Sequence, residues 1–245
     1  LQTHTKKLLA DTLTPVNIYL KLRDVYAGSI LLESSDYHGH ENSLSFICCE
    51  PIASFQVKGT TVERRYPDGT IETDNVGKVG DVTTMLEQFR KSFVPDPTPS
   101  KYANCGLFGY IAYDAIRFLE DVSITLREEL IPDILYKLYR YVIIVDHFSN
   151  ELNLFEHCFN GKGAGKNTLD RVEQIIFSQR FATYRFVQTE TETSTIGDEE
   201  FLRVIEKGKE HCFRGDVFQI VLSRRFTAGF KGDEFNVYRS LRSIN

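Results

Sequence analysis

Two neighbouring runs rich in β-branched and aromatic residues, 139–147 and 152–159, constrain the fold more than any other feature of this sequence. Such residues are enriched in strands, and a short gap allows consecutive strands to pair antiparallel. Strands and amphipathic helices are mixed along the chain without a regular βαβ alternation. The predicted fold class is therefore α+β, with mostly antiparallel sheets packed with helices.

Apolar residues spaced by three and four predict the helices, and β-rich runs between turn residues predict further strands. The predicted helices cover residues 15–25, 81–93, 168–181 and 198–213, and a last helix runs through Leu241. Lys21 is expected on the polar side of the first helix, and Asp81 and Asp233 are the expected caps of the second and the last. The further strands are 29–34, 46–49, short segments within 52–74 with a hairpin at 67–70, and 217–226. Polar or proline-rich loops are predicted at 35–43 and 94–100, with an interdomain linker at 188–195.

Composition excludes several classes of protein. The chain has 245 residues, 42% of them hydrophobic, which is enough to bury a core. A net charge of −5 argues against a nucleic-acid partner. The sequence contains no apolar run of about 18 residues, so no membrane span is predicted, and we expect no signal peptide. Five cysteines without C-x-x-C spacing indicate reduced thiols in a cytoplasmic protein.

Several local motifs favour structural interpretations. The glycine-rich segment 161–166 fails the spacing of a phosphate-binding loop, so a flexible loop is expected there. His38 and His40 lie near Asp36 and Glu41, but no third spaced ligand follows, so a solvated turn is favoured over a metal site.

Two segments carry candidate site residues. Leu31-Leu32-Glu33-Ser34 is a strand that ends in a carboxylate and a hydroxyl, which could hold an amino acid through its ammonium group; alone, it is more often a surface turn. In the strand predicted at 217–226, alternation places Gln219 on the same face as valines. Such an amide is either a satisfied core group or a site residue.

These segments occur among a set of landmarks that resembles the N-terminal half of anthranilate synthase component I. The landmarks are Thr14-Pro15-Val16, Leu31-Leu32-Glu33-Ser34, Gly106-Leu107-Phe108-Gly109-Tyr110, Tyr113-Asp114, Pro132-Asp133, residues 215–223, and Leu241-Arg242-Ser243-Ile244-Asn245. Their order matches that of the family and covers almost the whole chain. The resemblance implies a fold with a β-sandwich core, incomplete at the C-terminus.

The resemblance also implies an activity and its residues. The family converts chorismate and ammonia into anthranilate and pyruvate with Mg²⁺, takes ammonia from a glutamine amidotransferase subunit, and is inhibited by L-tryptophan. Leu32, Glu33 and Ser34 would bind the inhibitor, and Pro15 would shape the pocket. Gln219 would lie in the wall of the active site, where related enzymes that add water have a lysine base; ammonia needs no such base.

By the same resemblance, residues 1–187 form a regulatory and partner-binding domain, and 196–245 begin the chorismate-binding domain. The Mg²⁺ ligands would follow Asn245, so no metal site is expected within the chain. The chain alone should be inactive, and it should self-associate through unpaired strand edges. Two alternatives stay open at this point: aminodeoxychorismate synthase component I, and a non-catalytic module for amino-acid binding or subunit interaction.

Overall fold

The computed structural model describes residues 1–33, 43–97, 100–124, 131–159 and 167–244. The chain forms two compact units, Leu1–Ala182 and Thr183–Asn245. The boundary between the units lies close to the predicted end of the first domain at residue 187. The assignment of a regulatory and a chorismate-binding role to these domains stays a prediction.

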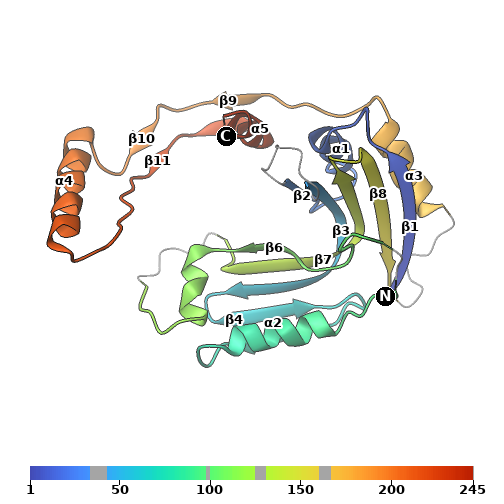
Figure 1. Ribbon diagram of the computed structural model, residues 1–245, viewed down its shortest axis with the longest axis horizontal. Helices are drawn as coiled ribbons and strands as arrows, with labels where there is room; N and C mark the ends of the chain where they lie inside the picture. Colours follow the sequence, from blue (N-terminus) through green and yellow to red (C-terminus); the bar gives the residue numbers. More distant parts are fainter. Residues whose placement is uncertain (34–42, 98–99, 125–130, 160–166, 245) are drawn as a thin grey trace. The chain divides into compact units, whose positions relative to one another are not determined.

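The first unit is built on one antiparallel sheet with helices against it (Figure 1). Its elements are β1 (Gln2–Leu9), α1 (Pro15–Leu22), β2 (Ile30–Glu33), β3 (Leu44–Lys58), β4 (Thr61–Arg65), β5 (Ile71–Asn75), α2 (Asp81–Lys91), β6 (Phe108–Ile111), the 3-10 helix η1 (Tyr113–Phe118), β7 (Ile134–Asp146), β8 (Glu151–Cys158) and α3 (Thr168–Phe177). The strand order is β1-β8-β7-β3-β4-β5, with β2 also pairing with β3 and β6 with β7. This architecture confirms the predicted class of helices packed with antiparallel strands.

The long strand β3 corrects one prediction from the sequence. Residues 52–58 were expected to form separate short strands, but they continue the strand that begins at Leu44. The register of β3 against β7 shifts between Pro51 and Ala53, and Glu50 has a φ of 57°. Proline lacks the N–H that a regular ladder uses, and a bulge can accommodate it without ending the strand. Figure 1 shows β3 and β7 bending together from one half of the sheet to the other.

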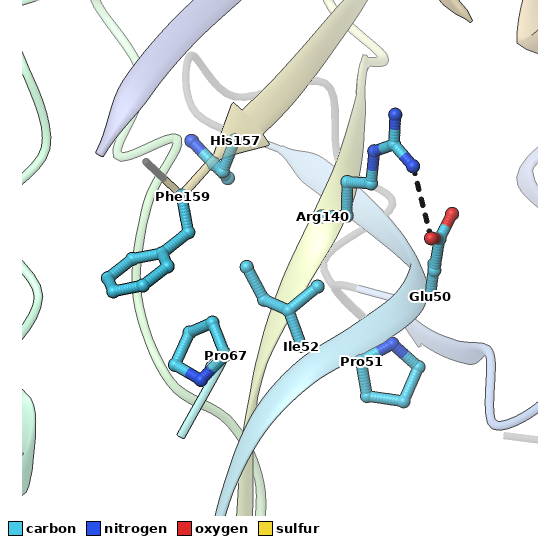
Figure 2. Close-up of a pocket in the computed structure, with 7 residues that line it drawn as sticks. All are labelled: Glu50, Pro51, Ile52, Pro67, Arg140, His157 and Phe159. Carbon is cyan, nitrogen blue, oxygen red and sulfur yellow. Dashed lines mark hydrogen bonds and ion pairs between the residues drawn. The ribbon is translucent and has the colours of Figure 1, made fainter. Parts of the chain in front are cut away.

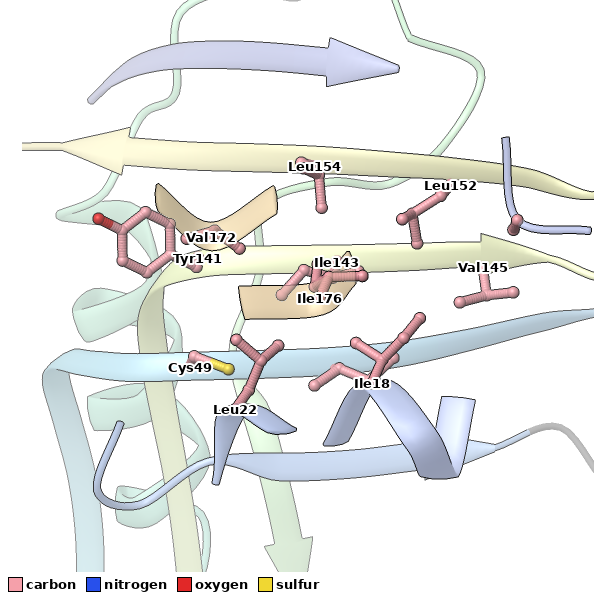
Figure 3. Close-up of a cluster of buried hydrophobic side chains, with 12 residues drawn as sticks. Ile18, Leu22, Cys49, Tyr141, Ile143, Val145, Leu152, Leu154, Val172 and Ile176 are labelled. Atoms are coloured by element: carbon pink, nitrogen blue, oxygen red, sulfur yellow. The ribbon is translucent and has the colours of Figure 1, made fainter. Parts of the chain in front are cut away.

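The helices cover different parts of this bent sheet. Figure 3 shows Ile18 and Leu22 of α1 meeting Ile176 of α3 and side chains of β3, β7 and β8 in one buried cluster. A second cluster joins Phe89 of α2 to residues of the other half of the sheet. A third lies on the sheet face opposite α1 and contains residues of β3, β7 and β8.

The structure confirms the predicted helices and corrects several of their ends. The hydroxyl of Thr14 accepts the N–H of Asn17, and Pro15 takes the first position of α1, where its missing N–H costs nothing. In α2, however, Gly80 and not Asp81 is the N-cap residue, and the N-cap residue of the last helix, Phe235–Arg242, is Glu234 and not Asp233. α1, α2 and α3 all end earlier than predicted, at Leu22, Lys91 and Phe177.

The second unit consists of α4 (Asp198–Arg214), α5 (Phe235–Arg242) and two short strand pairs. The strands are β9 (Phe186–Gln188) with β12 (Phe230–Gly232), and β10 (Thr193–Ser194) with β11 (Phe226–Thr227). The predicted linker 188–195 therefore contains paired residues. The prediction of a strand over 217–226 is wrong, because only its last residue, Phe226, pairs with another strand, at Ser194. A strand without a neighbouring strand would leave its backbone N–H and C=O groups unpaired.

Candidate functional site

The tryptophan-site residues predicted from the sequence lie around the end of β2, beside α1. β2 is antiparallel to β3, with Leu32 opposite Phe46 and Glu33 opposite Ser45. Pro15 is buried at the start of α1, which packs on both strands. Ser34 lies outside the described residues, as do residues 35–42 of the predicted loop and the segment 161–166. The structure thus brings Leu32 and Glu33 to one strand end and leaves their assignment as a binding site untested.

Leu32 and Glu33 point to opposite faces of the sheet. Leu31 packs in the cluster under α1 and α3, whereas Ile30 and Phe46 pack in the cluster on the other face. Since side chains alternate along a strand, Glu33 lies on the α1 face and Leu32 on the opposite face. The sequence did not show this division, because it follows from the register of β2 on β3.

The face that carries Leu32 is apolar and aromatic. The side chain of Leu32 is 40% exposed. The ring centroids of Phe46 and Phe108 are 5.8 Å apart, and those of Phe108 and Tyr139 are 6.4 Å apart. An exposed leucine next to aromatic rings provides a surface that suits a flat apolar ligand.

The face that carries Glu33 is polar at this point. Ser45 is fully buried, and its Oγ lies 2.8 Å from Nε2 of His147. The backbone N–H of His147 donates to the carbonyl of Ser43, which ties β7 to the start of β3. Sequence reasoning missed Ser45 and His147, although Ser45 adjoins one run that it identified as a strand and His147 is the last residue of another.

Gln219 lies in the second unit and is exposed, within a segment that has no regular secondary structure. Its neighbours are exposed too, with Phe218 and Val221 at 101% and 82%. The prediction that Gln219 lies on the same face of a strand as valines is therefore wrong. Its role in an active-site wall stays a prediction.

A pocket of about 350 Å³ lies at the bulge of β3, on its border with β7 and β8. Figure 2 shows its lining residues, which are Glu50, Pro51, Ile52, Pro67, Arg140, His157 and Phe159. Arg140 donates to Glu50 at 3.1 Å and to the buried Glu156 at 2.7 Å. Arg140 and the two glutamates thus pair with one another and link neighbouring strands, which favours a structural role for the residues of this pocket.

His157 is a buried histidine with a hydrogen-bond partner at each ring nitrogen. It is 1% exposed, and Nε2 lies 2.9 Å from the carbonyl of Asn104 and Nδ1 3.0 Å from the hydroxyl of Thr3. Nε2–H can donate to the carbonyl while Nδ1 accepts from the hydroxyl, which satisfies a neutral ring. Burial lowers the pKa of His157 below its ordinary value of 6.5.

We expect the free energy of unfolding to fall as the pH is lowered from 7 to 5. Below about pH 6.5 the unfolded chain binds a proton at His157 that the folded chain does not bind. Protonation therefore favours the unfolded chain, and stability keeps falling until the pH reaches the pKa of His157 in the folded chain. Urea titrations at both pH values measure the change, which His157→Gln should reduce. His4→Gln controls for the removal of one imidazole. An equal pH dependence in the wild type and His157→Gln would contradict the prediction.

Within the described residues, no group of three or more histidine, cysteine, aspartate or glutamate side chains is arranged to hold a metal ion. No helix in the described ranges is both long and apolar enough to cross a membrane.

Comparison with known proteins defines the class. Residues 27–245 match the family model of chorismate binding enzymes, so the chain belongs to that family. Anthranilate synthase component 1 of Aquifex aeolicus (strain VF5) is 30% identical over 98% of this chain and 50% of its own length. The same component of Acinetobacter calcoaceticus is 28% identical with the same coverage.

A solved structure agrees with the fold. The crystal structure of anthranilate synthase component I from Streptococcus pneumoniae TIGR4 aligns with a TM-score of 0.61 and 20% identity, covering 98% of this chain and 53% of that one. The resemblance found in the sequence is thus confirmed. The chain spans about half the length of the curated relatives it matches.

Proposed function

We propose that this chain carries the inhibitor-binding part of the large subunit of an anthranilate synthase. The whole enzyme would convert chorismate and ammonia into anthranilate and pyruvate in tryptophan biosynthesis, with Mg²⁺ and with ammonia from a glutamine amidotransferase partner. The observation that carries this proposal is the similarity to anthranilate synthases over nearly the full chain. These relatives disfavour the aminodeoxychorismate synthase alternative, and the cytoplasmic location stays a prediction.

The end of β2 supports a site for L-tryptophan. Its indole would pack on the apolar face that carries Leu32 and Phe46, and its ammonium group would pair with the Glu33 carboxylate at the strand end. Since Leu32 and Glu33 lie on opposite faces, the ligand must reach around the end of β2, where Ser34 follows. Pro15 would act indirectly, by fixing the start of α1 beside the strand.

Tryptophan binding can be measured directly, because the chain has no tryptophan of its own. Anisotropy of L-tryptophan fluorescence, excited at the red edge of indole absorption, should rise and saturate as the protein is added. Ser34→Ala should weaken binding at least tenfold, because the inhibitor loses a hydrogen bond to the hydroxyl group. Ser35→Ala is the matched control and should bind as the wild type does. An anisotropy that stays flat as the protein concentration is raised would contradict the site.

A further inference from the structure

A cavity of about 310 Å³ lies between the start of α1 and the end of α3, within the first unit. Its lining includes Lys21, Thr14, Asn17, Phe177, Gln179 and Phe181. None of these residues is among those assigned to tryptophan. The volume is at the lower end of the range of about 300–1,000 Å³ that is typical of small-molecule sites.

Lys21 is the charged group of this cavity, and it is buried. The residue is only 8% exposed, although its position in the helix suggested the polar side. Its Nζ donates to the carbonyl of Ile176 at 2.6 Å, in the last turn of α3. A cation is favourable at the C-terminus of a helix, which explains part of its burial.

The carbonyl of Ile176 leaves most of the hydrogen-bonding capacity of Lys21 unused. An ammonium group has three N–H donors, and this carbonyl is the only acceptor that Nζ contacts in the described part of the chain. No described carboxylate forms an ion pair with it, and burial lowers the pKa of Lys21 below its usual value. A buried charge without a counter-ion is costly.

The other groups around the cavity favour an anion with an apolar body. Of the described lining residues, Lys21 is the only charged one, while Phe177 and Phe181 supply aromatic rings. Thr14 and Asn17 are at the N-terminal end of α1, whose first turn has no acidic residue. The helix dipole there adds positive potential to that of the ammonium group.

We propose that this cavity binds a small organic carboxylate with a flat apolar body. The ammonium group of Lys21 holds the carboxylate through its remaining N–H donors, and the rings of Phe177 and Phe181 contact the apolar part. The inference is independent of the proposed tryptophan site, since the two sites share no residue.

Benzoate is a suitable probe, and benzyl alcohol is its uncharged counterpart. Calorimetric titration of the whole chain should show saturable binding of benzoate and much weaker binding of benzyl alcohol. Lys21→Met keeps the aliphatic stem but removes the charge, and we expect it to lower the affinity for benzoate at least tenfold. Lys58→Met, at the exposed end of β3, is the matched control and should leave the affinity unchanged.

Two further measurements keep the test decisive. Thermal unfolding shows whether Lys21→Met is folded; if it is not, Phe181→Ala replaces it, because this residue is 43% exposed and should tolerate truncation. Phe181→Ala should also weaken benzoate binding. Ser34→Ala, which should weaken L-tryptophan binding, should leave the affinity for benzoate unchanged, which separates this cavity from the tryptophan site. No benzoate binding by the wild type, or equal affinity in a folded Lys21→Met variant, would overturn the proposal.

Discussion

Arg140→Met is expected to lower the free energy of unfolding of the first unit by about 3–5 kcal/mol. Glu156 is 2% exposed, and Nε and Nη2 of Arg140 donate to its Oε1 at 3.0 and 2.7 Å. The hydroxyl of Thr168 donates to the other carboxylate oxygen. Without the guanidinium group, this buried carboxylate loses its counter-charge. Urea unfolding followed by circular dichroism measures the loss.

Two variants test whether the unpaired charge is the cause. Arg65→Met removes a guanidinium group from an exposed pair with Glu63, so it should cost less than about 1 kcal/mol. Adding Glu156→Gln to Arg140→Met should recover much of the lost stability, since the buried side chain is then neutral. A loss below 1 kcal/mol in Arg140→Met, at an unchanged denaturant slope, would show that the pair contributes little.

Gly109→Ala should destabilise the chain by about 3 kcal/mol, at the upper end of the usual cost of overpacking. Gly109 lies opposite Tyr136 where β6 pairs with β7. A Cβ atom added there would overlap the backbone carbonyl of Leu135, which cannot move without disturbing the ladder. The strand β6 must then shift or detach from β7.

Gly106→Ala provides a control within the same motif. No atom lies within 4 Å of a Cβ built on Gly106, so this substitution should change stability by less than about 0.5 kcal/mol. Urea unfolding of both variants gives the comparison, and faster hydrogen exchange in β6 would locate the damage. Equal stability of the two variants would contradict the proposed close approach of the backbones.

The sequence predicted elements whose signals are local. The hairpin between β4 and β5 follows from Asp68 and Gly69: the Asp68 carboxylate accepts the N–H of Thr70, and Gly69 adopts a φ of 95°. The pattern that begins at Thr14 likewise predicted α1. Such features depend on residues a few positions apart, which a sequence shows directly.

The errors concern features that depend on distant partners. The acceptor of Lys21 lies 155 residues further along the chain, so helical periodicity could not place this side chain in a buried cavity. Residues 217–226 have strand-like alternation, but pairing begins only at Phe226. At the candidate site, the motif that ends in Glu33 could be located, whereas its division between two sheet faces required the register on β3.

The strand β1 connects the two ends of the first unit. It pairs along its whole length with β8, and its Thr3 contacts His157, 154 residues away. Contacts between residues so far apart slow folding, because a long loop must close before they form. The edge of the sheet therefore stays open during synthesis until β8 has been made. We infer that β1 is among the last strands of the first unit to pair.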